Sequence, residues 1–131
     1  MPVSMTPFLM FEGRAEEALA FYTSLVPRSQ IDEVIHFPPG GPGAAGSVMK
    51  GTATIAGQRV KFFDSPVPHA FTFTPAISLF VECESEAQLR ELAAALADGG
   101  AELMPLGNYG FSQLFAWVND RFGVSWQLNL A

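Results

Sequence analysis

The stretch AISLFVECESEAQLRELAAALADGG, residues 76–100, decides the fold. It opens with an apolar run of strand length and continues into a helix, because its later apolar residues recur at helical spacing. Ser85 is placed to cap that helix, with Gln88 three residues later at the reciprocal position of a capping box. Gly99 and Gly100 end the helix. The predicted apolar stripe of the helix is Leu89, Leu92, Ala93 and Leu96.

Three further strands are predicted after this helix. The stretch AELMPL, residues 101–106, is a short one, and YGFSQLFAWV, residues 109–118, is longer. The last strand lies in DRFGVSWQLNL, residues 120–130, where apolar and polar residues alternate with the period of a strand. This half of the chain therefore reads strand, helix, strand, strand, strand.

The residues before position 76 show the same order. An apolar run at residues 6–11 precedes an amphipathic helix over residues 15–26, which Pro27 helps to end. A strand over residues 29–37 follows, and then SVMKGTATIAGQRVKFFDS, residues 47–65, reads as a hairpin that turns at Ala56 and Gly57.

We therefore predict an α+β fold of two βαβββ modules. Module one covers residues of about 5–65, a proline-rich linker about 66–74 and module two about 75–131, within a single domain 1–131. Each helix is expected on the outer face of its curved mixed sheet, which leaves the other face to line a cavity.

Composition excludes several classes of function. The 131 residues are 49% hydrophobic and 15% charged, with a net charge of −6 and a pI near 4.7. An acidic chain without a basic patch does not suit nucleic acid or an anionic membrane surface. Cys83 is the only cysteine, so no disulfide within the chain is possible. No signal peptide and no apolar run of the ~20 residues that span a bilayer are evident, so we expect a cytoplasmic protein.

Alternation along the strands predicts which side chains face the cavity. In the last strand Trp126, Leu128 and Leu130 point to the helix, while Ser125, Gln127 and Asn129 point away. The same split places Met49 with Gly51 and Ala53, and Ile77 with Leu79 and Val81, on the helix side. The alternative is that the polar faces are simply solvated, and exposed rings argue against it. The predicted ligand-binding residues are Lys50, Lys61, Phe63, Phe80, Gln113, Phe115, Trp117 and Gln127.

Three stretches resemble one family. PFLMFEG…EEALAFYTSL, TFTPAISLFVECES and DRFGVSWQLNL are similar to the PhnB-like branch of the vicinal oxygen chelate superfamily, whose members are often labelled 3-demethylubiquinone 3-methyltransferase. The resemblance implies two βαβββ modules in a homodimer. It also implies a divalent metal held by His, Glu or Gln from the first and last strands of each module. The matching positions are Pro7, Lys61, Ala76 and Gln127, of which only Gln127 could be a ligand, so we expect no metal and no cofactor.

Other candidate chemistry is weaker. His36 and His69 form no metal-binding motif, and His69 is either an acid or base at the pocket mouth or an ordinary loop histidine. Cys83 is expected to be a buried structural thiol. The loop PPGGPGAAG, residues 38–46, lacks the spacing of a phosphate loop. The methyltransferase name implies binding of S-adenosylmethionine, but the sequence has no strand–GxGxG–helix unit for that cofactor.

The leading prediction is metal-independent binding of a small, partly aromatic or anionic molecule. Lys50 and Lys61 would attract a carboxylate or phosphate, unless both project from a sheet edge into water. The alternatives are an enzyme of the same superfamily that uses Lys, Gln or His69 for proton transfer, and a structural dimer without a ligand. A homodimer, a small-molecule ligand and no nucleic acid or membrane partner are expected.

Overall fold

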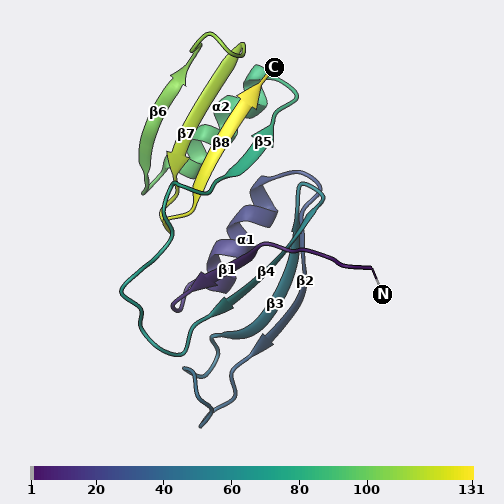
Figure 1. Ribbon diagram of the computed structural model, residues 1–131, viewed down its shortest axis with the longest axis vertical. Coiled ribbons are helices and arrows are strands. Elements are labelled where there is room, and N and C mark those ends of the chain that lie inside the picture. The colour runs from purple at the N-terminus through teal and green to yellow at the C-terminus, as the bar shows by residue number, and fades with distance from the viewer. Residues whose placement is uncertain (1) are drawn as a thin grey trace. The chain divides into compact units, whose positions relative to one another are not determined.

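A computed structural model of the chain describes residues 2–131; Met1, the first residue of the predicted domain, lies outside the described part. The described residues form two compact units, here called module one, up to Ala70, and module two, Phe71–Ala131. Each has the order βαβββ (Figure 1). Module one contains β1 (Phe8–Phe11), α1 (Ala15–Leu25), β2 (Gln30–His36), β3 (Val48–Ile55) and β4 (Gln58–Asp64). Module two contains β5 (Leu79–Glu82), α2 (Glu86–Ala97), β6 (Ala101–Gly107), β7 (Leu114–Asn119) and β8 (Ser125–Leu130).

The sheet of module one has the strand order β1-β4-β3-β2, with β1 parallel to β4 and the other pairs antiparallel. Helix α1 covers one face and contacts β2, β3 and β4 (Figure 1). The predicted mixed sheet with an outer helix is therefore confirmed for this module. The fully buried side chains between helix and sheet are Ala15, Ala18, Leu19, Tyr22, Val48, Ala53, Val60 and Phe62.

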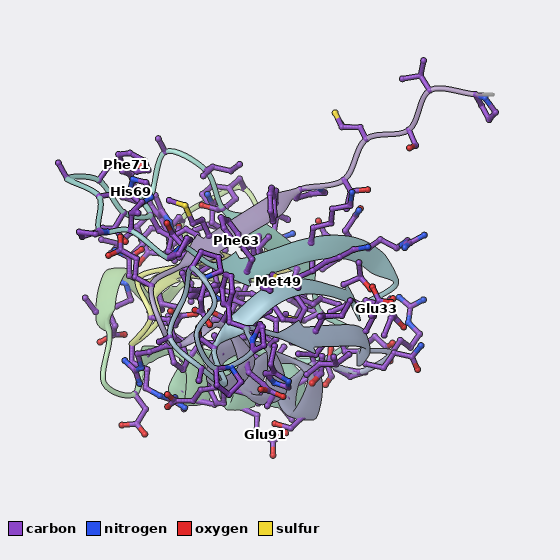
Figure 2. All side chains as sticks on the ribbon, turned by 90° about the horizontal axis from the view of Figure 1, so that it is seen from below. Glu33, Met49, Phe63, His69, Phe71 and Glu91 are labelled. Atoms are coloured by element: carbon purple, nitrogen blue, oxygen red, sulfur yellow. The ribbon has the colours of Figure 1, made fainter. Side chains whose placement is uncertain are left out.

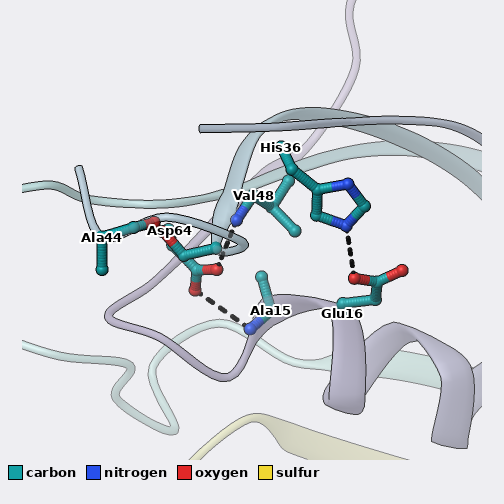
Figure 3. Close-up of polar contacts among 7 residues, drawn as sticks. Ala15, Glu16, His36, Ala44, Val48 and Asp64 are labelled. Atoms are coloured by element: carbon teal, nitrogen blue, oxygen red, sulfur yellow. Dashed lines mark hydrogen bonds and ion pairs between the residues drawn. The ribbon is translucent and has the colours of Figure 1, made fainter. Parts of the chain in front are cut away.

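Helix α1 begins on a carboxylate from the far end of its module. The residue before the helix, Arg14, makes no side-chain capping bond. Asp64, at the end of β4 and only 2% exposed, instead accepts hydrogen bonds from the backbone N–H groups of Gly13 at 2.7 Å and Ala15 at 3.0 Å. Its other oxygen accepts from the N–H of Val48 at 2.8 Å (Figure 3). A negative charge at a helix N-terminus also complements the helix dipole. Asp64 thus ties α1 to β3 and β4.

The hairpin predicted at Ala56 and Gly57 is present. Both residues have positive φ, 50° and 83°, as a two-residue turn between twisted strands requires. At the other end of β3 the pairing with β2 shifts between Ile35 and His36. This bulge turns Val48 into the core and leaves Met49 42% exposed. The expectation that Met49 lies with Gly51 and Ala53 on the helix side was wrong, because simple alternation does not survive a bulge.

The sheet of module two has the order β5-β8-β7-β6, again with one parallel pair, β5 with β8. Helix α2 contacts β6, β7 and β8, and the predicted stripe from Leu89 to Leu96 is buried. Ser85 caps α2 as predicted, because its Oγ accepts from the N–H of Gln88 at 3.1 Å. In return, Oε1 of Gln88 accepts a hydrogen bond from the N–H of Glu84 at 2.8 Å, one residue earlier than in a standard capping box.

Two strands of module two are shorter than expected. β5 begins at Leu79, because a turn in which Ile77 donates to the carbonyl of Thr74 precedes it. Ile77 is 74% exposed, so its predicted place on the helix side was wrong. β7 begins at Leu114, because the side chain of Asn108 accepts from the N–H of Gly110 and closes a local turn. Neither helix of the described residues is long and apolar enough to cross a membrane.

Candidate functional site

The face of each sheet that its helix leaves uncovered is called here the open face. On the open face of module two, Gln127 of β8 lies between Phe80 of β5 and Trp117 of β7 in the strand register. The next row along places Asn129 between Glu82 and Phe115. Four predicted ligand-binding residues therefore share this face: Phe80, Phe115, Trp117 and Gln127.

Two of them, Trp117 and Gln127, are linked through Ser125 and Ser78 in a continuous chain of hydrogen bonds, called here the hydroxyl–amide chain. The indole Nε1–H of Trp117 donates to Oγ of Ser125 at 2.8 Å. The hydroxyls of Ser125 and Ser78 lie 2.7 Å apart, and Nε2 of Gln127 donates to Oγ of Ser78 at 3.2 Å. Ser125 is only 1% exposed, whereas Ser78, Trp117 and Gln127 are half-buried. The chain orients Trp117 and Gln127 relative to each other.

Aromatic rings surround Phe115 on the same side of module two. Phe115 is 4% exposed, and its ring centroid lies 4.9 Å from Phe111, 6.1 Å from Tyr109 and 6.4 Å from Phe80. The three outer rings remain 42–62% exposed. Such a group of exposed rings is a typical recognition surface. Sequence reasoning left Tyr109, Ser78 and Ser125 out of the site, although Ser78 and Ser125 were assigned to the correct face.

Gln113 does not join the hydroxyl–amide chain. It lies in the bend before β7, is exposed, and donates its side-chain amide to the carbonyl of Ala131 at 2.8 Å. It was predicted as a strand residue beside Phe115 and Trp117. The turn that shortens β7 removes it from the strand.

The open face of module one is different in charge. Lys61 of β4 lies between Phe8 of β1 and Thr52 of β3, and the Phe8 and Phe63 rings lie 5.0 Å apart between centroids, tilted by 31°. Figure 2 shows Phe63, Met49 and Glu33 along this module. Lys50 forms an exposed ion pair with Glu33 at 3.8 Å. Among the ion pairs of residues 2–131, none involves Lys61.

Charge is distributed unequally between the modules. Residues up to Ala70 include five lysines and arginines against six aspartates and glutamates, whereas Phe71–Ala131 holds two against seven. Three of the five basic residues of module one lie on β3 and β4 with their side chains on the open face: Lys50, Arg59 and Lys61. The positive face belongs to module one, whereas the open face of module two carries the amides of Gln127 and Asn129 and the carboxylate of Glu82.

The residues do not fit the metal site that the superfamily implies. The register places Phe8, not Pro7, beside Lys61, and Phe80, not Ala76, beside Gln127. Ala76 lies in the turn before β5, so the counted position was wrong. Whether the counted positions (Pro7 and Ala76) or the register positions (Phe8 and Phe80) are used, Gln127 is the one residue of the set with an atom that could bind the metal. Within residues 2–131, no group of three or more His, Cys, Asp or Glu side chains could hold a metal ion.

Neither histidine lies beside the hydroxyl–amide chain in the strand register. His36 ends β2, and its Nε2 lies 2.6 Å from a carboxylate oxygen of Glu16 on α1 (Figure 3). His69 lies in the loop after β4 (Figure 2), and its Nε2 lies 2.8 Å from Oγ of Ser65. That hydroxyl also donates to the carbonyl of Val67 at 2.9 Å.

Cys83 is buried, as predicted. Burial raises the pKa of its thiol above the ordinary value of 9.0. A hydrogen bond with the backbone of Asn129 lowers the pKa in part, and the neighbouring Glu82 carboxylate raises it further. A thiol with a raised pKa is a poor nucleophile.

Comparison with known proteins agrees with this architecture. The solved structure of a putative 3-demethylubiquinone-9 3-methyltransferase, PhnB protein, from Bacillus cereus is 52% identical, covers 98% of this chain and 100% of its own, and superposes with a TM-score of 0.95. The protein PA1353 from Pseudomonas aeruginosa is 25% identical over 98% of each chain, with a TM-score of 0.82.

A more distant structure shares the fold alone. The fosfomycin resistance protein FosX from Listeria monocytogenes is 12% identical, covers 100% of this chain and 94% of its own, and has a TM-score of 0.65. No curated protein matches the sequence. The sequence profile of 3-demethylubiquinone-9 3-methyltransferase matches residues 3–129. The chain therefore belongs to the 3-demethylubiquinone-9 3-methyltransferase family of PhnB-like proteins.

Proposed function

We propose that this chain binds a small, partly aromatic or anionic molecule on the open face of a sheet, without a divalent metal. The observation that carries the proposal is the hydroxyl–amide chain, which holds Trp117 and Gln127 side by side on the open face of module two. A ring supplies apolar area, at roughly 25 cal/mol per Å² removed from water. An amide both donates and accepts hydrogen bonds without the cost of burying a charge.

The open face of module one, taken by itself, would suit an anionic ligand. Lys61 lies beside Phe8 in the register and has no ion-pair partner among the described residues, so its charge is available to a carboxylate or phosphate. Lys50 is partly neutralised by Glu33 and contributes less. The methyltransferase name of the family is not part of this proposal. The two βαβββ modules contain no glycine-rich turn between a parallel strand and a helix that would hold S-adenosylmethionine.

The test is native mass spectrometry of the protein purified from its own host. A small molecule retained by wild-type protein and absent from Trp117→Ala is the expected result. Trp117 lies on the open face, so the variant should keep a cooperative thermal melt. A variant that unfolds outright would show that Trp117 is part of the core and would contradict the proposal. A substrate consumed in a metabolite screen would favour an enzyme instead.

Elemental analysis tests the absence of metal. Wild-type protein should carry no stoichiometric zinc, nickel, manganese or iron. Gln127→Glu should not create a metal site, because the neighbouring open-face residues Phe80 and Trp117 offer no ligating atom. About one tightly held metal ion per chain in the wild-type protein would overturn this part of the proposal.

We also propose a homodimer. Among residues 2–131, both sheets end in strands that pair on one side only, β1 and β2 in module one and β5 and β6 in module two. Such edges favour pairing with another chain. Sedimentation equilibrium should give twice the chain mass of 14.1 kDa at micromolar concentration, and a monomer there would contradict the proposal.

A further inference from the structure

The hydroxyl–amide chain holds more protons than its three hydrogen bonds use, and one of the spare protons belongs to a hydroxyl. The N–H of Trp117 goes to Ser125, and the amide of Gln127 donates to Ser78. The contact between the two hydroxyls uses only one of their two protons. One hydroxyl proton is therefore left without an acceptor within the chain.

Burial decides which hydroxyl keeps that proton. Ser125 is 1% exposed, and an unsatisfied donor there would cost about 1–3 kcal/mol. Ser125 therefore donates to Ser78, and the half-buried Ser78 directs its own proton outward, where water or a ligand can accept it. The open face thus presents one hydrogen-bond donor at Ser78.

An acceptor stands beside this donor. Because Nε2 of Gln127 is bonded to Ser78, its Oε1 points elsewhere, and it has no partner within the described residues. A second amide oxygen on the same strand face, Oδ1 of Asn129, is buried and also unpaired, because its Nδ2 is held by Glu82 at 3.1 Å. Adjacent Ser78 and Gln127 therefore offer a hydroxyl donor and an amide acceptor, next to the second N–H of the Gln127 amide.

The surroundings favour a flat and neutral ligand. Phe80 and Trp117 flank Gln127 on its two neighbouring strands. The two basic residues of module two are engaged away from this face: Arg90 pairs with Glu86 on α2 at 2.9 Å, and Arg121 lies over the Phe122 ring in the turn after β7. An anion on this face would find no cation of module two to pair with it.

We infer that the open face of module two recognises a planar ring carrying a cyclic amide, in which a carbonyl and an N–H lie on the same edge. The ring carbonyl accepts the outward proton of Ser78, and the ring N–H donates to Oε1 of Gln127. Phe80 and Trp117 cover the apolar part of the ring. This inference rests on the proposed function and adds the chemical class of the ligand at this face.

The test uses three probes of similar size on the intact protein. Quinolin-2-one has both groups, N-methylquinolin-2-one lacks the N–H, and 2-naphthoate is an anion with acceptors only. Binding is followed by the NMR signal of the Trp117 indole N–H, assigned with Trp117→Phe. Quinolin-2-one should bind at least tenfold more tightly than each of the other two.

Two variants separate the two hydrogen bonds. Gln127→Met should bring quinolin-2-one and its N-methyl form to equal affinity, because the acceptor is gone, whereas a purely steric effect of the methyl group would persist. Ser78→Ala should weaken both by about tenfold and keep their ratio. The matched controls are Thr54→Val, which removes an open-face hydroxyl of module one, and Gln58→Met, which removes an exposed amide. Both should leave the affinities unchanged.

The outcomes distinguish this inference from the proposed function. If the probes bind but 2-naphthoate binds as tightly as quinolin-2-one, the Gln127 amide presents its nitrogen and the inference is wrong while ring binding stands. Equal affinity of quinolin-2-one and its N-methyl form in the wild-type protein would have the same meaning. If no probe shifts the Trp117 signal up to millimolar concentration, both the inference and the proposed function fail at this face.

Discussion

The two modules share one architecture but differ at equivalent positions. In each, the first and last strands pair in parallel, and the register places Lys61 beside Phe8 in module one where Gln127 lies beside Phe80 in module two. A phenylalanine stands on the first strand of both modules, whereas its neighbour on the last strand is a lysine in module one and a neutral amide in module two. The difference shows that the fold fixes where a side chain projects, while the residue type at that place decides which ligand group it can meet.

Their helices also begin by different means. Helix α2 is capped locally, by Ser85 three residues before Gln88. Helix α1 depends on Asp64, which lies 49 residues after Ala15 and reaches it only in the folded module. A local cap affects mainly its own helix, whereas Asp64 also holds the start of β3 through Val48. Module one should therefore be more sensitive to the loss of its cap.

The largest effect is expected from Asp64→Ala. It leaves three buried or part-buried N–H groups without an acceptor and should lower the free energy of unfolding by about 3 kcal/mol or more. The matched variant Ser85→Ala should cost only about 1 kcal/mol. Urea denaturation measures both. Equal costs would show that the two caps are equivalent and would remove this difference between the modules.

The core under each sheet provides the second test. Gly51 pairs with Phe62 in module one, and Ala116 pairs with Leu128 at the equivalent place in module two. A Cβ added at Gly51 would lie 2.4 Å from the Phe62 ring, so Gly51→Ala should cost about 1–3 kcal/mol.

The double variant Gly51→Ala with Phe62→Leu copies the pair of module two. It should recover part of that loss, because the smaller side chain makes room for the new methyl group. A thermal melt of the single and double variants checks this. If the stability losses of Gly51→Ala and Phe62→Leu simply add in the double variant, the smaller side chain at position 62 does not make room for the methyl group, and the two modules pack this pair differently.

A smaller effect is expected at the positive face. Lys61→Gln makes module one resemble module two at this position and should weaken 2-naphthoate binding about fivefold, or ~1 kcal/mol, with the difference shrinking at high salt. Titration followed by backbone NMR shifts of β4 measures it. Arg90→Gln, which removes the same charge from α2, is the control. An equal loss in both variants would indicate a general charge effect.

The smallest effect concerns Cys83. Because its pKa is raised in the folded protein, the thiol stays protonated at a pH where the unfolded chain has begun to ionise. The stabilisation is complete below pH 9.0 and is lost as the pH rises from there through the folded pKa. Alkylation by iodoacetamide should accelerate at a higher pH than it does for free cysteine. As the pH rises above 9.0, Cys83→Ala should lose less stability than the wild-type protein does. Fast alkylation at pH 8 would contradict the assignment.

Much of the fold could be predicted from local pattern. The capping box at Ser85, the stripe from Leu89 to Leu96 and the hairpin at Ala56 and Gly57 depend on residues close in sequence, so their spacing was enough. Alternation assigned both faces of β8 correctly. It failed at Met49 and Ile77, because a bulge and a turn interrupt the period of the strand.

The sequence by itself determined the two βαβββ modules, the acidic charge and the side of each sheet on which Gln127, Trp117 and Lys61 project. Only the tertiary structure decided that Asp64 starts α1, that Phe80 and not Ala76 stands beside Gln127, and that Gln113 turns to Ala131. The same holds for the link from Trp117 through Ser125 and Ser78 to Gln127. Periodicity fixes the direction of a side chain within its own strand. Register between strands and hydrogen bonds between distant residues exist only once the chain has packed.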